Sequence, residues 1–418
     1  MKWTTPVAAA PLPLKGAPLA DRRSRIRGGP LARCQLNMSG AIDWAPMLRL
    51  TLLGSVLALG PLAWLWLRHR GAAPERRLHA LTLLTLFLTF DLVLFGAFTR
   101  LTDSGLGCPD WPGCYGNASP LGARAQIDVA QGLQPGGPVT HSKAWVEMLH
   151  RYLAAAVGVL ICVMAAMSWR LRLQRVPGPS PWWATLTLAW VIAQGAFGAL
   201  TVTMKLYPAI VTLHLLGGLG LLAVLAVQDQ VFAPRPLSLP RGPLAGVWVV
   251  AGLLLAQVAL GGWVSTNYAV LACRDFPTCQ GQWWPPMDFG HAFTLRRELG
   301  ETAAGVYLPF AALTAIHVSH RVMAFIVLAA MALLAWRVHA MADPSLRRFA
   351  LGLALLGLWQ LASGLSNVVL GWPIVAAIAH TGGAAMLAIV LASLLARAHG
   401  LSSGSRRSAA QAGRPVVV

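Results

Sequence analysis

Residues 96–116 read GAFTRLTDSGLGCPDWPGCYG, and residues 261–281 read GGWVSTNYAVLACRDFPTCQG. At an offset of 165 the two stretches share a glycine at each end and the same Cys-x-Asp-x-Pro-x-Cys pattern between them. The register continues with Gln194/Gln360, Gly198/Gly364 and His214/His380 at 166, and with His150-Arg151/His320-Arg321 at 170. So many coincidences in near-constant register indicate an internal duplication.

The composition indicates a membrane protein. Of the 418 residues, 56% are hydrophobic and 11% charged, against about 25% charged in average chains. The net charge of +19 would suit nucleic acid only on a solvated face, which so apolar a chain does not offer. We therefore expect a lipid bilayer, and no nucleic acid, as partner. Nine segments are long and apolar enough to cross it: 47–67, 80–101, 145–169, 182–204, 207–231, 243–265, 308–336, 349–369 and 373–397.

The duplication divides the last eight of these spans into two units of four. Because four is an even number, both units enter the membrane from the same side, as parallel repeats do. The sequence therefore predicts an all-α polytopic membrane protein with two four-helix transmembrane bundles (eight core helices) plus one extra N-terminal helix. The expected segments are a basic disordered tail (1–46), the extra helix with a cytoplasmic loop (47–79), the two bundles (80–233 and 243–397) and a cytoplasmic tail (398–418).

The charges of the connections predict the orientation. The short basic connections and the C-terminal tail hold 16 Lys and Arg against three acidic residues, whereas the opposite side, which includes the two long connections, holds seven of each. The positive-inside rule places the long connections, about 102–144 and 266–307, outside, and the C-terminus inside. The arginines of 1–46 fit this orientation less well. Either that segment is disordered, with Met38 or Met47 as the true start, or the 47–67 helix is a loosely packed accessory.

Four of the eleven histidines occupy duplicated positions, namely His150, His214, His320 and His380. Each is expected about 5–12 residues into a helix that starts at the outer face, which places it roughly 8–18 Å deep. Two neutral imidazoles facing each other across a bundle are suitable ligands for a six-coordinate heme iron. A single membrane histidine more often bonds a neighbouring helix, but four in duplicated register favour a functional role.

The residues beside these histidines differ between the two units. Arg151 and Arg321 each follow a histidine and are expected either to bind a carboxylate such as a heme propionate or to extend toward the interface. Glu147 shares a helix face with His150, and the equivalent position in the second unit is His317. A carboxylate there either handles protons or is a surface residue at the helix mouth. The asymmetry suggests that one bundle reacts while the other holds a cofactor.

Four of the six cysteines form two pairs in the outer connections. A zinc site would need further ligands, which neither connection offers. Five intervening residues are enough for a disulfide ring, and the outer side of a bacterial inner membrane is oxidising. We expect each disulfide to hold its loop as a lid over one bundle, with a redox-active role as the alternative. The pairs are Cys108/Cys114 and Cys273/Cys279, and Cys34 and Cys162 are single.

Together these motifs resemble the heme A synthase family of cytochrome oxidase assembly enzymes, in its cysteine-containing bacterial type. The resemblance covers about 80–400. It rests on the duplicated four-helix units, the pattern GxxTRLTxSGL at 96–106, Glu147-x-x-His150-Arg151, Trp111-Pro112 and the paired cysteines.

The resemblance implies a specific reaction and specific ligands. Heme O would be hydroxylated stepwise at its C8 methyl group, and the resulting gem-diol would lose water to leave the formyl group of heme A. The substrate heme is expected in the N-terminal bundle with His150, His214 and the essential Glu147. Heme b is expected in the C-terminal bundle, which is similar to a b-type cytochrome. The remaining implied residues are the heme b ligands His320 and His380 and the disulfides Cys108–Cys114 and Cys273–Cys279.

Two other classes of protein compete with this hypothesis. A diheme b-type cytochrome that only carries electrons would not need Glu147 in one unit alone. A heme or ion transporter would more often have helices broken at the midplane. Heme O synthase, oxidase assembly factors and a second copy of the chain are the expected partners. Asp91, within a core helix, either joins a proton path or bonds a neighbouring helix.

Overall fold

The computed structural model describes residues 44–176, 179–232 and 236–400. These residues form helices, and the only β-pairing among them consists of isolated bridges. The elements are α1 (Ala45–Arg68), α2 (Pro74–Leu101), α3 (Arg124–Leu133), α4 (His141–Leu173), α5 (Pro181–Thr203), α6 (Pro208–Gln230), α7 (Arg241–Thr266), η1 (Ala269–Ala272), α8 (Phe289–Ala292), α9 (Phe310–His339), α10 (Pro344–Val369) and α11 (Ile374–Ala398). The tails predicted at 1–46 and 398–418 lie almost wholly outside the described residues.

Nine of the described helices are long and apolar enough to cross a membrane, namely α1, α2, α4, α5, α6, α7, α9, α10 and α11. They coincide with the nine predicted spans, so the fold class of an all-α polytopic membrane protein is confirmed. Helix α4 begins at His141 rather than at 145, because Thr140 caps it by accepting a hydrogen bond from the Lys143 amide at 3.3 Å. Hydropathy alone does not detect this polar first turn.

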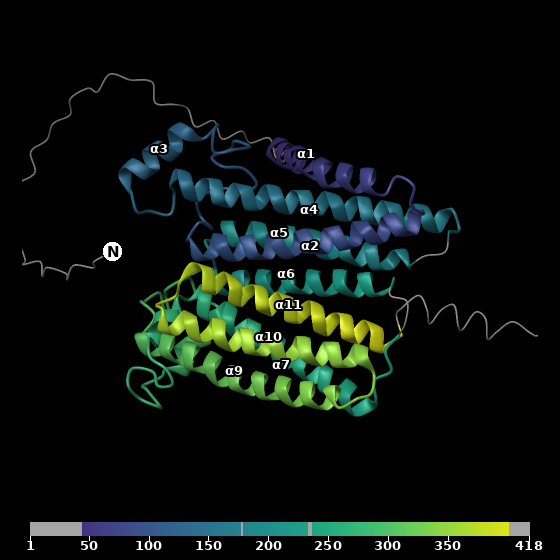
Figure 1. The fold of residues 1–418 in the computed structure, drawn as a ribbon. Helices are drawn as coiled ribbons and strands as arrows, with labels where there is room; N and C mark the ends of the chain where they lie inside the picture. Colours follow the sequence, from purple (N-terminus) through teal and green to yellow (C-terminus); the bar gives the residue numbers. More distant parts are fainter. Residues whose placement is uncertain (1–43, 177–178, 233–235, 401–418) are drawn as a thin grey trace, which may run out of the picture. The chain divides into compact units, whose positions relative to one another are not determined.

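Helices α2, α4, α5 and α6 lie beside a second group formed by α7, α9, α10 and α11 (Figure 1), and the contacts within each group close a ring of four. In the first bundle α2 contacts α4, α4 contacts α5, α5 contacts α6, and α6 contacts α2. The same order recurs in the second bundle with α7, α9, α10 and α11. In each ring the second and fourth helices therefore lie diagonally opposite each other. The bundles meet through α6 with α11, α6 with α7, and α2 with α11. Helices α2 and α6 are equivalent to α7 and α11 in the duplication. The contact of α6 with α7 is therefore equivalent to that of α11 with α2, as an approximate two-fold axis requires.

Two hydrogen bonds join repeat-equivalent positions directly. Arg100 Nη2 donates to the carbonyl of Ser265 at 2.7 Å, and the Tyr268 hydroxyl donates to Asp103 Oδ1 at 2.6 Å. Each pair is separated by 165 residues, the offset of the duplication. Symmetry-related positions can touch only near the axis, so these four residues mark where the axis passes between the bundles.

Helix α1 packs closely against α4, outside the first ring (Figure 1). A Cβ atom on Gly54 would lie 2.5 Å from the Cβ of Ala155, so only glycine allows this approach. The extra helix is therefore closely packed rather than a loose accessory.

Both long connections contain short elements that the sequence did not predict. Helix α3 lies in the first connection, and η1 and α8 lie in the second. They are too short for a hydropathy window to detect. Each connection also contains a disulfide-closed segment, and we call residues 108–117 and 273–282 the cysteine loops. The ends of the bundles where α4, α6, α9 and α11 begin carry these loops.

Candidate functional site

A cavity of about 1230 Å³ extends through the interior of both bundles. It exceeds the roughly 300–1,000 Å³ of an ordinary small-ligand pocket, so it has room for more than one ligand of that size. Helix α1 contributes Met47, Leu50 and Thr51 to its wall. The predicted site residues that line it are Glu147, His150, Arg151, His214, His320, Arg321 and His380, together with His317.

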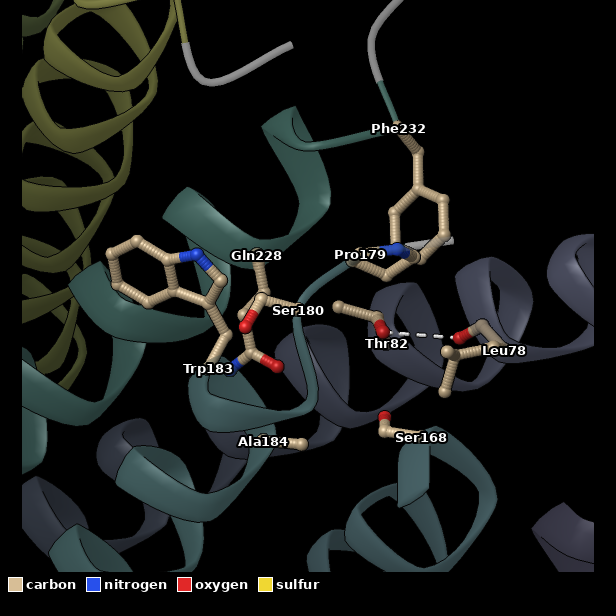
Figure 2. A pocket seen from close by; sticks show the side chains of 9 residues that line it. All are labelled: Leu78, Thr82, Ser168, Pro179, Ser180, Trp183, Ala184, Gln228 and Phe232. Carbon is tan, nitrogen blue, oxygen red and sulfur yellow. Dashed lines mark hydrogen bonds between the residues drawn. The ribbon is translucent and has the colours of Figure 1, made fainter. Parts of the chain in front are cut away.

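A second pocket, of about 10 Å³, lies toward the other end of the first bundle. Figure 2 shows Trp183, Gln228 and Phe232 around it, with Thr82 bonded back to the Leu78 carbonyl. Its lining contains no histidine or acidic side chain, and it holds at most a water molecule. The large cavity is therefore the candidate site.

The four duplicated histidines form one pair in each bundle. His150 on α4 interacts electrostatically with His214 on α6, and His320 on α9 does so with His380 on α11. Within each pair the histidines come from the diagonally opposite helices of the ring. They lie six to ten residues after the start of their helices, roughly 9–15 Å below the cysteine-loop end. The depth predicted from the sequence is therefore close to the observed one.

A glycine on each of the other two helices of the ring makes room for an imidazole. A Cβ atom on Gly96 or Gly261 would lie 3.1 Å from Cε1 of His150 or His320, respectively. On Gly198 it would lie 3.4 Å from Cε1 of His214, and on Gly364 it would lie 3.2 Å from Cε1 of His380. Each duplicated glycine thus faces one duplicated histidine. Because glycine has no side chain, it leaves space for the imidazole ring.

Glu147 is buried against the first cysteine loop. Its Oε2 accepts a hydrogen bond from the Cys108 amide at 2.8 Å, and its Oε1 accepts one from Arg151 Nη2 at 2.5 Å. Only 3% of Glu147 is exposed, so the alternative of a surface residue at the helix mouth is wrong. The carboxylate instead lines the cavity beside His150 and ties the loop to α4.

Arg151 and Arg321 hold the cysteine loops. Arg151 Nη1 donates to the carbonyl of Gly113 at 2.6 Å, and Arg321 Nη1 donates to the equivalent carbonyl of Thr278 at 2.9 Å. Arg151 is ion-paired with Glu147, whereas Arg321 faces His317 at 3.3 Å. No acidic group of the described residues lies within 4.0 Å of Arg321, so its charge is the less compensated of the two. Neither arginine simply extends to the interface, as one sequence-based alternative held.

The two cysteine loops have the same internal structure. Each contains a disulfide, Cys108–Cys114 or Cys273–Cys279, and a cis X-Pro bond between its cysteines. In the first loop, Asp110 accepts hydrogen bonds from the amides of residues 115 and 116; Asp275 accepts them from the equivalent amides of residues 280 and 281. These repeated details support the duplication that the sequence indicates.

Asp275 makes the second loop sensitive to acid. Hydrogen bonds from Thr278 Oγ1 and the amides of Gly281 and Gln280 lower the pKa of this carboxyl from 3.8 to about 2. Because the folded pKa is lowered, the stabilisation is complete above about pH 4 and is lost as the pH falls through 2. We expect Asp275→Asn to increase the rate at which a phosphine reduces Cys273–Cys279 severalfold at pH 5, but hardly at pH 2. The reduction rate is measured by alkylating the released thiols and detecting them by mass spectrometry. Because the reagent's own pH dependence affects both proteins equally, it cancels in the ratio of variant to wild-type rates. A ratio independent of pH would contradict this role.

The structure also locates residues outside the predicted site, some of which line the cavity and some of which do not. Asp91 lies exposed on α2 and does not line the cavity. Cys162 is a free thiol, and Cys34 lies outside the described residues. Arg100 and Gln257 line the cavity but were not predicted as site residues. Both lie about one helical turn from a duplicated glycine, Arg100 from Gly96 and Gln257 from Gly261. Their proximity to these glycines in the sequence could have identified them.

The fold and cavity define a multi-pass α-helical membrane protein in which two half-buried histidine pairs line a common interior space. A sequence model of the cytochrome oxidase assembly proteins matches residues 79–392, and the chain belongs to that family. A heme A synthase of Shewanella oneidensis is 38% identical over 319 residues, which cover 74% of this chain and 93% of that protein. Heme A synthases of Methylobacterium radiotolerans and Rhizorhabdus wittichii are 29% and 28% identical, with 74% and 79% of this chain and 86% and 97% of those proteins covered.

Proposed function

We propose that the protein is a heme A synthase, a membrane oxidoreductase that converts the C8 methyl group of heme O to a formyl group for cytochrome oxidase assembly. The observation that carries this proposal is a difference between two otherwise matching histidine sites: an acidic side chain lies beside one histidine pair and not beside the other. Both bundles present a histidine pair with glycine clearance, but in the part of the chain that the structure describes a buried carboxylate occurs in the first bundle only. An electron carrier with two equivalent hemes would not need this difference. The family relationship supports synthesis over the carrier alternative.

The residues of each bundle fit a heme held by two histidines. The imidazoles lie on diagonally opposite helices, the glycines leave space between them, and the surrounding cavity is large and mainly apolar. Among the described residues no group of three or more His, Cys, Asp and Glu could hold a metal ion, so a histidine pair in each bundle would hold a heme rather than a bare ion. His320 and His380 would hold heme b, and His150 and His214 would receive heme O.

Bound heme b would supply electron transfer, and the side chains of this chain would supply binding, positioning and proton handling. Oxidation of a methyl group to a formyl group takes its oxygen from water and releases four protons, and four electrons pass to an external acceptor. Glu147 is the acidic side chain beside the first histidine pair, and its carboxylate oxygens are the atoms that would accept protons there. Arg151, which neutralises it, and the Cys108 amide hold this carboxylate at the cavity wall.

The arginines would also assist binding. The weakly compensated charge of Arg321 suits a heme propionate in the second bundle, because a guanidinium binds carboxylates with paired hydrogen bonds. Arg151 would do the same less strongly, because Glu147 already neutralises it.

We further propose a location and partners. The protein would lie in the bacterial inner membrane with its cysteine loops on the periplasmic side, where disulfides form. The basic short connections would lie in the cytoplasm. Heme O synthase would deliver the substrate, oxidase assembly factors would receive the product, and copies of the chain would associate.

The proposal is tested by extracting and chromatographing the hemes of cells that make heme O, with and without this chain. Heme A should appear only when the chain is produced. Cells that contain the full-length chain in the membrane and accumulate heme O without heme A would refute the proposed function.

The glycines that face the imidazoles give a finer test. Gly261→Ala should force the His320 ring to move by a few tenths of an ångström and reduce bound heme b, measured from the Soret band. Gly96→Ala should slow heme O conversion and leave heme b unchanged. Gly252→Ala is the matched control, since it lies on α7 like Gly261 and a Cβ there would meet nothing within 4 Å. Wild-type heme b content in Gly261→Ala would argue against the site.

A further inference from the structure

The two histidine pairs differ in what holds their imidazoles. In the second bundle, His380 Nδ1 lies 2.9 Å from Ser363 Oγ, and His320 Nδ1 lies 3.1 Å from Gln257 Nε2. In the first bundle, Nδ1 of His150 and Nδ1 of His214 are enclosed, and neither has a hydrogen-bond partner in the part of the chain that the structure describes. A polar contact is thus present at both histidines of one pair and missing at both histidines of the other.

The register of the repeats explains this difference. Gln257 on α7 corresponds at an offset of 165 to Leu92 on α2, and Ser363 on α10 corresponds at 166 to Phe197 on α5. Leucine and phenylalanine side chains contain no hydrogen-bonding atoms, so the first bundle offers no partner from these positions. The glycines facing the imidazoles are present in both bundles. The bundles therefore differ in the hydrogen bonds to the rings rather than in the space around them.

Ser363 determines which nitrogen of His380 carries a proton. The Ser363 hydroxyl donates to the Trp359 carbonyl at 2.7 Å, and a hydroxyl has only one proton to donate. Toward His380 it must therefore accept, so Nδ1 is protonated and Nε2 keeps its lone pair. A neutral imidazole with a free Nε2 lone pair is the form that binds iron, and a hydrogen bond at Nδ1 is the usual way to fix it.

Gln257 can do the same for His320. Its Nε2 also donates to the His320 carbonyl at 3.2 Å, while its Oε1 is buried and has no partner within the described ranges. Gln257 Nε2 also lies 3.4 Å from Nε2 of the ring. Half a turn of the amide group gives up the bond to the His320 carbonyl and presents Oε1 to an Nδ1–H of the ring. The side chain therefore has the acceptor that a ligand histidine needs within reach.

We infer that Ser363 and Gln257 are positioning residues that hold His380 and His320 ready to bind iron, and that they make the second bundle the site of a permanently retained heme. The first bundle lacks these partners, so its heme is exchanged, as a substrate and product must be. This inference rests on the proposed function, since it assigns the retained and the exchanged heme to particular bundles. Partners of this kind typically change metal affinity by about 10–100-fold.

The test uses the full-length protein and follows the transfer of its heme b to excess apomyoglobin. Ser363→Ala should release heme b about 10–100-fold faster than wild type. Its low-spin ferric electron paramagnetic resonance signal should also shift, because the His380 ring is free to turn. Ser363→Thr keeps the hydroxyl and should restore both properties. Ser366→Ala is the matched control on α10, since this hydroxyl donates to the Ser363 carbonyl at 2.8 Å rather than contacting a histidine.

Two further variants test the comparison between bundles. Gln257→Leu installs the residue found at the equivalent position of the first bundle and should also speed heme release. Leu92→Gln combined with Phe197→Ser should make the first bundle retain its heme, so that heme O and heme A copurify in a severalfold higher ratio to heme b.

Wild-type transfer rates and resonance signals in both Ser363→Ala and Gln257→Leu would overturn the inference. The proposed function would survive that result as long as the wild-type protein contains heme b and makes heme A. A wild-type protein that binds no heme b would instead overturn the proposed function itself.

Discussion

Protein in which His320 or His380 is replaced by alanine is expected to purify without the heme b that we propose for the second bundle. The two imidazoles come from α9 and α11 on opposite sides of the ring, so no single helix can supply both ligands. Removal of either ring would take away one of the two side chains that would hold the heme and would leave a gap beside a glycine. The Soret band and the pyridine hemochrome should therefore fall to near background in both variants.

The first-bundle histidines should behave in the opposite way. His150→Ala and His214→Ala are expected to retain heme b and to lose conversion of heme O. His339→Ala is the matched control. His339 lies on α9, as His320 does, but it is exposed and near the far end of that helix. Normal heme b in both His320→Ala and His380→Ala would exclude the assignment of the cofactor to the second bundle.

Glu147→Ala is expected to keep heme b and to abolish heme A formation. The change removes the carboxylate that would accept protons and also leaves Arg151 buried without its ion-pair partner. Breaking such a buried pair typically costs about 3–5 kcal/mol, so some loss of stability should accompany the loss of activity. Activity is measured as the heme A to heme O ratio, and stability as the thermal midpoint of the purified protein.

Two additional variants separate proton handling from structural support. Glu147→Gln keeps an oxygen that accepts from the Cys108 amide but cannot ionise, so it should remain inactive while holding the loop. Glu147→Ala combined with Arg151→Ala removes the unpaired charge but also the donor to the Gly113 carbonyl, so it should recover part of the stability without recovering activity. Glu298→Ala, at an exposed position of the other long connection, is the control for loss of an acidic residue. Wild-type conversion by Glu147→Gln would rule out the proton role.

The spans and the histidines could be predicted because each depends on a short-range or repeated pattern. Hydropathy over about 20 residues identifies membrane helices, and the duplication identifies which histidines are equivalent. The short elements α3, η1 and α8 could not be predicted, because contacts with the bundles rather than local periodicity stabilise segments of this length. Helix boundaries were missed where a cap such as Thr140 adds a polar turn.

The roles of the arginines could not be predicted for a different reason. A guanidinium that follows a histidine can reach lipid headgroups, a bound carboxylate or a nearby loop, and only the folded loop decides among them. The carbonyls that Arg151 and Arg321 bind belong to segments some 40 residues away in sequence. Gln257 and Ser363, in contrast, were within reach of the sequence: each is a polar residue whose repeat-equivalent position is apolar. Comparing the repeats for differences as well as for identities would have found them.

The residues at the two-fold axis show what is gained by joining both bundles in one polypeptide. In a dimer of identical four-helix chains, every residue on the axis would face its own copy. Arginine would then lie opposite arginine and aspartate opposite aspartate, which is electrostatically unfavourable. A single chain can place Arg100 against Ser265 and Asp103 against Tyr268 instead. Covalent fusion therefore permits complementary pairs at the centre of the molecule, and the two halves can become chemically different without losing the fit between them.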